Sequence, residues 1–237
     1  MNLESILISK DAALIGVLRP TLEKISVNVL VCSEIGNSNE SLAKRKFDAV
    51  IIDCDDLQNG TGLLRDLRQT QSNSKSVAFA VLNGKTTTQE AFKLGANFVL
   101  QKPLTPLHAT RCFHAALDFM IRERRRYFRY PVEMTVHVTS KGVEFTAQTT
   151  NLSEKGLALS AANKLYKDTE LTLRFALPGV NASLELKGRV AWADSAGQAG
   201  IQFLDIPQSS QYHLDKWLSE RMTQEMPASL QERARLV

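Results

Sequence analysis

Two short polar segments near the middle of the chain carry the residues best suited to bind an anionic ligand. The first, RERRRYFRY over residues 122–130, holds five arginines and one glutamate. An arginine side chain stays charged, offers five donors in a planar fork and stacks on aromatic faces. Arg125 and Arg129 lie four positions apart, so they could clamp a phosphodiester and the edge of a purine together. This segment therefore predicts a site for a small anion.

The second segment, NLSEKG over residues 151–156, follows about 20 residues later. Asn151 and Ser153 stand at positions i and i+2, and side chains at that spacing share one face of a strand. Gly156 permits a tight turn and a close approach of the backbone. The segment therefore predicts short polar groups that face a ligand beside a turn.

The net positive charge of the chain is concentrated in residues 119–130, which contain most of the first segment. The net charge is +4 overall, with +1 over residues 1–118, +4 over 119–130 and −1 over 131–237. A nucleic-acid face needs basic residues spread over a surface. We therefore expect that the chain does not bind nucleic acid. The alternative, a nucleic-acid-binding protein, would show an affinity for nucleic acid that falls steeply as the salt concentration rises.

Composition and motifs exclude several classes of function. Cys32, Cys54 and Cys112 are widely spaced and form no CxxC pair, which argues against a disulfide framework and against a zinc site. The four histidines form no metal-binding motif, and P-loop, GxGxxG and GxSxG patterns are absent. Polar residues interrupt the N-terminus, and no apolar stretch reaches the roughly 18 residues of a membrane span. We expect a cytoplasmic protein that is not an enzyme and has no resident metal.

The first half of the chain, residues 1–118, alternates short apolar runs with helical patterns. Strands are expected at 5–9, 27–32, 47–56, 76–83 and 97–103, with helical patterns from Leu14 to Leu22 and at 62–68, 87–94 and 105–126. Such alternation predicts a parallel five-stranded sheet covered by helices on both faces, a doubly wound α/β domain.

The pattern changes to period two after a basic helix end and linker at residues 119–130. Alternating strands are expected at 132–138, 144–150, 171–175, 184–192 and 200–203, and a helix at 209–222. Short alternating strands separated by Gly, Asn and Pro predict a small antiparallel β-barrel with a C-terminal helix over residues 131–237. Trp192 lies on an alternating strand and is expected in the core, and the end of the chain from Pro227 is expected to be a polar tail.

The two polar segments resemble the signature of the PilZ domain family, RxxxR followed by (D/N)xSxxG. Arg125–Arg129 supplies the first part and Asn151–Gly156 the second, and the stretch Gly188–Asp205 is similar to the late hairpin of the family. The resemblance covers roughly residues 123–220.

The resemblance implies a receptor for cyclic di-GMP that regulates a partner and performs no chemistry. The expected ligand-binding residues are Arg124, Arg125, Arg126, Arg129, Asn151, Ser153 and Gly156. Ligand binding is expected to order the arginine loop, to change the arrangement of the domains and so to act on an unidentified protein partner that controls motility, adhesion or exopolysaccharide synthesis. The sequence is compatible with a homo-oligomer, and a ligand-free interaction module is an alternative.

Residues 5–118 resemble response-regulator receiver domains. Asp53 follows the third strand, at the position of the phosphoacceptor, and Lys102-Pro103 follows the fifth. At the end of the first strand Asp11 remains as the acidic residue, next to Lys10, and Asn83 replaces the hydroxyl residue after the fourth strand. These departures favour a pseudo-receiver used for interaction. The alternative is phosphorylation of Asp53, supported by Asp11 and Lys102, which would need Mg²⁺.

Overall fold

The computed structural model describes the backbone of residues 1–237 and every side chain except that of Ile35. The chain divides into two compact units. The receiver-like unit comprises Met1–Arg124 and Met226–Val237, and the barrel unit comprises Arg125–Glu225. The last twelve residues, which the sequence pattern placed with the barrel as a polar tail, therefore belong to the receiver-like unit. No helix among the described residues is both long enough and apolar enough to span a membrane.

The receiver-like unit is built around a parallel sheet in the order β2-β1-β3-β4-β5. Its strands are β1 (Leu3–Ile8), β2 (Val27–Cys32), β3 (Ala49–Asp53), β4 (Val77–Leu82) and β5 (Phe98–Gln101). The helices are α1 (Ala12–Glu23), α2 (Ile35–Lys44), α3 (Gly60–Leu67), α4 (Thr88–Lys93), α5 (Pro106–Tyr127, which continues into the barrel unit) and α7 (Ala228–Leu236). The predicted doubly wound α/β architecture is confirmed; α2 and α7 had not been predicted.

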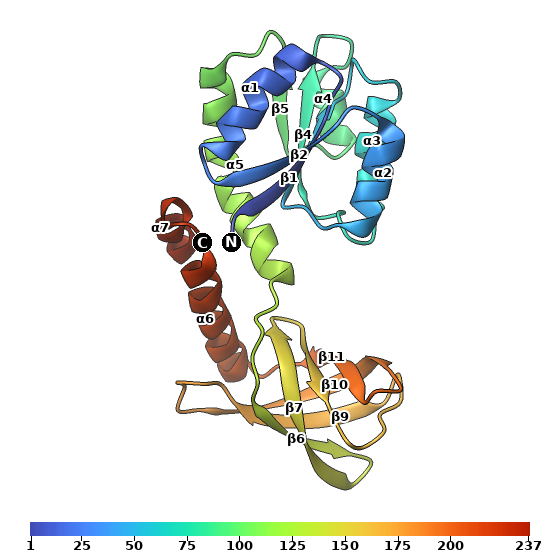
Figure 1. The fold of residues 1–237 in the computed structure, drawn as a ribbon, viewed down its shortest axis with the longest axis vertical. Coiled ribbons are helices and arrows are strands. Elements are labelled where there is room, and N and C mark those ends of the chain that lie inside the picture. Colours follow the sequence, from blue (N-terminus) through green and yellow to red (C-terminus); the bar gives the residue numbers. More distant parts are fainter. The chain divides into compact units, whose positions relative to one another are not determined.

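The central strands are apolar on both sides because helices cover both faces of the sheet. Every residue of β3 and β4 is buried. In Figure 1, α1 and α5 cover one face, and α2, α3 and α4 lie on the other. Phe79 of β4 shows the packing against α5, since its ring lies 5.1 Å from that of Phe113 in an edge-to-face contact. Because all neighbouring strands run parallel, their carboxyl ends lie at one edge of the sheet.

The barrel unit is a closed barrel in the order β10-β11-β8-β7-β6-β9. Its strands are β6 (Thr135–Ser140), β7 (Val143–Ser153), β8 (Gly156–Ser160), β9 (Glu170–Ala176), β10 (Ser183–Ala193) and β11 (Gln198–Asp205), followed by α6 (Gln208–Glu225). Inward residues alternate with exposed ones, most clearly along β10. Leu214, Trp217 and Leu218 of α6 complete the barrel core. The predicted barrel with a following helix is confirmed, and β8 is the strand that had not been predicted.

Candidate functional site

The last turn of α5 carries three consecutive arginines whose side chains have different partners. Arg124 is buried in the receiver-like unit, where its guanidinium donates hydrogen bonds to both carboxylate oxygens of Asp48. The shortest contact joins Nη2 to Oδ2 at 2.6 Å. Asp48 also accepts a hydrogen bond from the backbone N–H of Glu4 at 2.7 Å. Arg124 therefore anchors the end of α5 to the sheet, and we do not include it in the ligand site.

Arg125 and Arg129 belong to the barrel unit but face different elements. Arg125 Nη2 donates to Ser219 Oγ of α6 at 3.1 Å, and this arginine is half-buried. Arg129 is exposed, and its Nη1 lies 3.4 Å from Asn151 Oδ1, the carbonyl oxygen of a residue near the end of β7. Arg126 is exposed on the same helical turn as Arg125. The structure thus brings Arg129 to the second motif and holds Arg125 against α6.

The second motif forms the tight hairpin that joins β7 to β8. Ser153 and Gly156 pair across the hairpin, and the buried Ser153 hydroxyl donates to the Gly156 carbonyl at 2.9 Å. A Cβ atom at Gly156 would lie 2.2 Å from the carbonyl oxygen of Ile201 on β11. Glycine is therefore required here because β8 and β11 approach closely. Ser153 and Gly156 shape the hairpin, and Asn151 presents its amide toward Arg129.

A hollow of about 500 Å³ opens beside this hairpin. Arg129, Asn151, Lys155, Gly156 and Trp192 are among the residues that line it. None of its described lining residues is acidic. Positive side chains beside an amide and an aromatic ring are suited to a phosphorylated ligand with a flat base. This hollow is the candidate functional site.

Trp192 lies at the wall of this hollow and is 50% exposed, so the prediction that it belongs to the core is wrong. The register of β10 against β11 shifts between Val190 and Trp192, and this bulge changes which side chains face outward. The indole lies over Gly200, where an added Cβ would come within 2.1 Å of Nε1. The barrel therefore offers an indole ring at its surface beside Arg129 and Asn151.

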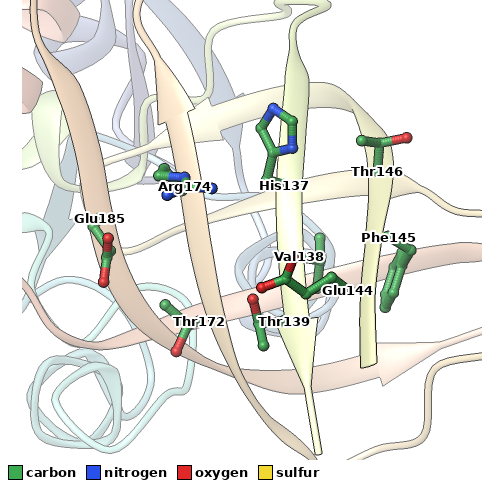
Figure 2. A pocket seen from close by; sticks show the side chains of 9 residues that line it. All are labelled: His137, Val138, Thr139, Glu144, Phe145, Thr146, Thr172, Arg174 and Glu185. Carbon is green, nitrogen blue, oxygen red and sulfur yellow. The ribbon is translucent and has the colours of Figure 1, made fainter. Parts of the chain in front are cut away.

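A second hollow, of about 370 Å³, lies on the outer wall of the barrel. Figure 2 shows its side chains, with His137 and Arg174 on neighbouring strands. Its lining also includes Glu144 and Glu185, and Glu185 is the cross-strand neighbour of Arg174. Two carboxylates oppose the binding of a phosphodiester, so this hollow fits an anionic ligand less well than the one beside the hairpin.

The carboxyl ends of β1, β3 and β5 form a separate charged cluster in the receiver-like unit. Lys102 Nζ lies 2.9 Å from Asp11, 3.0 Å from Asp53 and 2.7 Å from Asp56. Burial opposes the charged ammonium, but hydrogen bonds to Asp56, Asp11 and Asp53 outweigh it and raise the pKa of Lys102. The predicted set of Asp53, Asp11 and Lys102 comes together. Asp56 also joins it, because a turn after β3 carries this residue back toward the strand ends.

This cluster fits a divalent cation in its donor atoms. Asp11, Asp53 and Asp56 each offer a carboxylate oxygen, and these atoms lie within 4.8 Å of one another. Mg²⁺ prefers such oxygen ligands. Asp53 is buried, and its Oδ1 has no hydrogen-bond partner among the described residues, whereas its Oδ2 accepts from Ser9 Oγ at 2.7 Å. The ammonium of Lys102 contacts all three carboxylates, so a cation would have to share them with it.

The models of two known families match the two parts of the chain. The model of the response regulator receiver domain matches residues 6–111, and the model of the PilZ domain matches residues 123–220. The fold and these two matches indicate a protein built of two signalling domains. The chain carries a response regulator receiver domain followed by a PilZ domain. A PilZ domain implies a role as a receptor for cyclic di-GMP, and both domains are generally non-catalytic signalling modules.

Solved structures resemble one or the other part of the chain. The receiver domain of a sensor histidine kinase from Pseudomonas aeruginosa PAO1, with magnesium in its active-site cleft, is 17% identical over 48% of this chain and 97% of that one, with a TM-score of 0.43. An inhibitor of motility from Bacillus subtilis is 19% identical over 44% of this chain and 54% of that one, with a TM-score of 0.39. The PilZ domain of CeSA from a cellulose-synthesizing bacterium is 22% identical over 40% of this chain and 98% of that one, with a TM-score of 0.33. No curated protein sequence matches this chain.

Proposed function

We propose that this chain is a non-enzymatic receptor for cyclic di-GMP that binds its ligand in the hollow beside the β7–β8 hairpin. The observation that carries the proposal is that Arg129, Asn151 and Trp192 line one hollow in a PilZ domain. In this proposal Arg129 and Arg125 bind phosphodiester oxygens and a purine edge. Asn151 hydrogen-bonds the ligand, Trp192 stacks on a base, and Lys155 and Arg126 add positive charge. Ser153 and Gly156 hold the hairpin in shape.

We further propose that ligand binding changes the arrangement of the two domains and so regulates a protein partner. Arg124 pairs with Asp48 in the receiver-like unit, while Arg125, the next residue, contacts Ser219 in the barrel unit. A ligand that draws Arg125 to its phosphate alters the chain directly beside an anchored residue. Such a switch requires that the ligand bind one arrangement more tightly than the other. Limited proteolysis at residues 122–129 tests this step, and cleavage that is unchanged at saturating ligand would contradict it.

The fluorescence of Trp192 tests the proposed binding mode. The chain holds two tryptophans, Trp192 and Trp217, and Trp217 is buried in the barrel core. A base stacked on Trp192 should quench its emission in a saturable manner, and the Trp192→Phe variant should lose that response because Trp217 remains shielded. Stacking of a base on an aromatic ring contributes about 1–3 kcal/mol, so Trp192→Ala should weaken binding about 5- to 150-fold. Quenching that persists undiminished in Trp192→Phe would place the ligand elsewhere.

A second candidate function is phosphorylation at Asp53, with a divalent cation held by Asp11 and Asp56. The cluster of three carboxylates around Lys102 supports this alternative. It predicts that acetyl phosphate labels the wild type in the presence of Mg²⁺ and that Asp53→Asn abolishes the label. Absence of labelling would leave the receiver domain as an interaction module.

A further inference from the structure

The floor of the hollow beside the β7–β8 hairpin is formed where β8 lies against β11. Two cross-strand pairs lie there: Ala158 with Gly200, and Gly156 with Gln202. Ile201 belongs to the barrel core, so Gly200 and Gln202 on either side of it face outward, because successive side chains of a strand alternate. Gln202 is exposed and lines the hollow, whereas the other members of the two pairs have at most a methyl group. The carboxamide of Gln202 therefore stands beside a floor of small residues.

Trp192 of β10 covers the part of this floor that is next to Gln202. It is the cross-strand partner of Gly200, and a Cβ atom added to Gly200 would lie 2.1 Å from Nε1 of the indole and 2.5 Å from Cε2. Gln202 follows Gly200 by two positions, so both lie on the same face of β11, about 7 Å apart along the strand. The indole is 50% exposed. A base that stacks on it therefore lies in the hollow within reach of the Gln202 carboxamide.

Two of the described lining residues, Asn151 and Gln202, have side chains that both donate and accept hydrogen bonds. Asn151 lies on β7, and the strands β8 and β11 separate it from Trp192 on β10. Its carbonyl oxygen faces Arg129. Gln202 lies on β11, directly beside β10. Gln202 is therefore the amide that is placed to recognise the edge of a base on the indole.

We propose that Gln202 determines base specificity by hydrogen bonding to the Watson–Crick edge of a guanine stacked on Trp192. A carboxamide offers an N–H donor beside a carbonyl acceptor, and guanine presents O6 as an acceptor beside N1–H as a donor. Proteins that hold a base against an aromatic side chain also recognise it through this edge. Gln202 donates to O6 and accepts from N1–H, while Arg129 and Lys155 bind phosphate. This role rests on the proposed function, because it needs cyclic di-GMP to occupy the hollow.

Calorimetric titration with two ligands tests this role. The probes are cyclic di-GMP and its analogue methylated at N1 of both guanines, in which a methyl group replaces the N1–H donor. Wild type should bind the methylated ligand at least about fivefold more weakly, because the carbonyl of Gln202 loses its donor and meets a methyl group. Gln202→Ala should bind cyclic di-GMP about three- to tenfold more weakly than wild type, and its affinities for the two ligands should agree within about twofold.

Gln198→Ala is the matched control. Gln198 precedes Gly200 by two positions, as Gln202 follows it, so the control removes the same side chain from the same face of β11. Gln198 lines a separate hollow of about 440 Å³ beside the β10–β11 hairpin and is not among the described residues that line the hollow of Trp192. Its replacement should change the affinity for cyclic di-GMP less than about twofold. A loss as large as that of Gln202→Ala would overturn the specific role of Gln202.

The remaining outcomes separate this role from the receptor function. If wild type binds both ligands equally well, or if Gln202→Ala binds cyclic di-GMP as tightly as wild type, the role of Gln202 is overturned and the receptor function stands. The same holds if N1 methylation weakens binding to Gln202→Ala as much as binding to wild type. If wild type does not bind cyclic di-GMP, the receptor function is overturned together with the role of Gln202. The comparison of the two ligands in wild type does not depend on the folding of any variant.

Discussion

At the scale of single residues, three arginines at and just after the end of α5 have three different roles. Arg124 forms a buried ion pair with Asp48, and Arg125 donates a hydrogen bond to Ser219 of α6. Arg129 lines the hollow beside the hairpin. The sequence could predict an anion site at the arginine run because charge and spacing are local properties. It could not tell these three apart, since the partner of each lies far away along the chain. Asp48 is 76 residues from Arg124, and Ser219 is 94 residues from Arg125.

Replacement of Arg124 should reveal a structural role. Arg124→Ala leaves the carboxylate of Asp48 buried without its main counter-charge, which should lower the free energy of unfolding of the receiver-like unit by about 3–5 kcal/mol. Arg19→Ala, which breaks the exposed pair with Glu23, should cost less than about 1 kcal/mol. Urea unfolding measures both. If the Arg124→Ala protein were as stable as wild type but no longer bound the ligand, the structural role would be contradicted and Arg124 would be a ligand-binding residue.

Gly156 should be needed for the barrel before it is needed for the ligand. An alanine Cβ at this position would meet the Ile201 carbonyl at 2.2 Å, so Gly156→Ala should destabilise the barrel unit by about 1–3 kcal/mol or more. Gly142→Ala is the comparison, because its Cβ would meet no atom within 4 Å and only its left-handed φ of 80° opposes it, at about 1 kcal/mol. Thermal unfolding compares the two, and equal stability of Gly156→Ala and wild type would contradict the packing described.

At the scale of elements, apolar patterning predicted most strands and helices but missed three. The α2 helix is polar, with Leu42 and Ser38 among its buried residues, so it shows little apolar periodicity. The β8 strand is five residues long, too short for a period to be distinguished. In α7, Leu230 and Ala234 are the buried residues, spaced i and i+4 in an otherwise polar segment. Trp192 was misplaced for a related reason, since a bulge breaks the alternation from which its burial had been predicted.

The ammonium of Lys102 neutralises part of the negative charge of three carboxylates at the strand ends, so its removal should destabilise the receiver-like unit. Lys102→Ala leaves three carboxylates together and should destabilise the receiver-like unit by about 3–5 kcal/mol at neutral pH. Millimolar Mg²⁺ should restore part of that stability, because oxygen ligands and negative charge then lack a cation. The control is Lys85→Ala, an exposed lysine 3.6 Å from Asp56, which should cost less than about 1 kcal/mol. Loss of stability without any recovery in Mg²⁺ would argue against a cation site.

At the scale of the whole molecule, the chain leaves the receiver-like unit at Arg124 and returns to it at Met226. Met226, Leu230 and Ala234 are buried there. Ser229 meets Ser26 at 2.7 Å, and Arg233 donates to the carbonyl of His114. The fold class and both motifs could be predicted from patterns within each half. The return of the chain to the receiver-like unit could not be predicted. It depends on the packing of α7, a short polar helix whose sequence shows few apolar residues.

Truncation after Glu225 tests the importance of this return. Removal of residues 226–237 exposes the apolar surface that α7 covers, so the receiver-like unit should unfold at lower temperature, by several degrees. The affinity for cyclic di-GMP should change less than threefold, because the proposed site lies wholly in the barrel unit. Differential scanning calorimetry and titration of the truncated chain measure the two quantities. An unchanged unfolding temperature would contradict the packing of α7.

The central claim is that the hollow beside the β7–β8 hairpin binds cyclic di-GMP through the arginine segment. The most direct measurement is a calorimetric titration of the full chain, beside Arg129→Ala and Arg125→Ala. Wild type should bind with a Kd of about 1 μM or tighter, which corresponds to roughly −8 kcal/mol. Both variants should lose most of that binding while keeping their unfolding temperatures. A wild type that releases or takes up no heat and shows no saturation at 100 μM ligand would contradict the account.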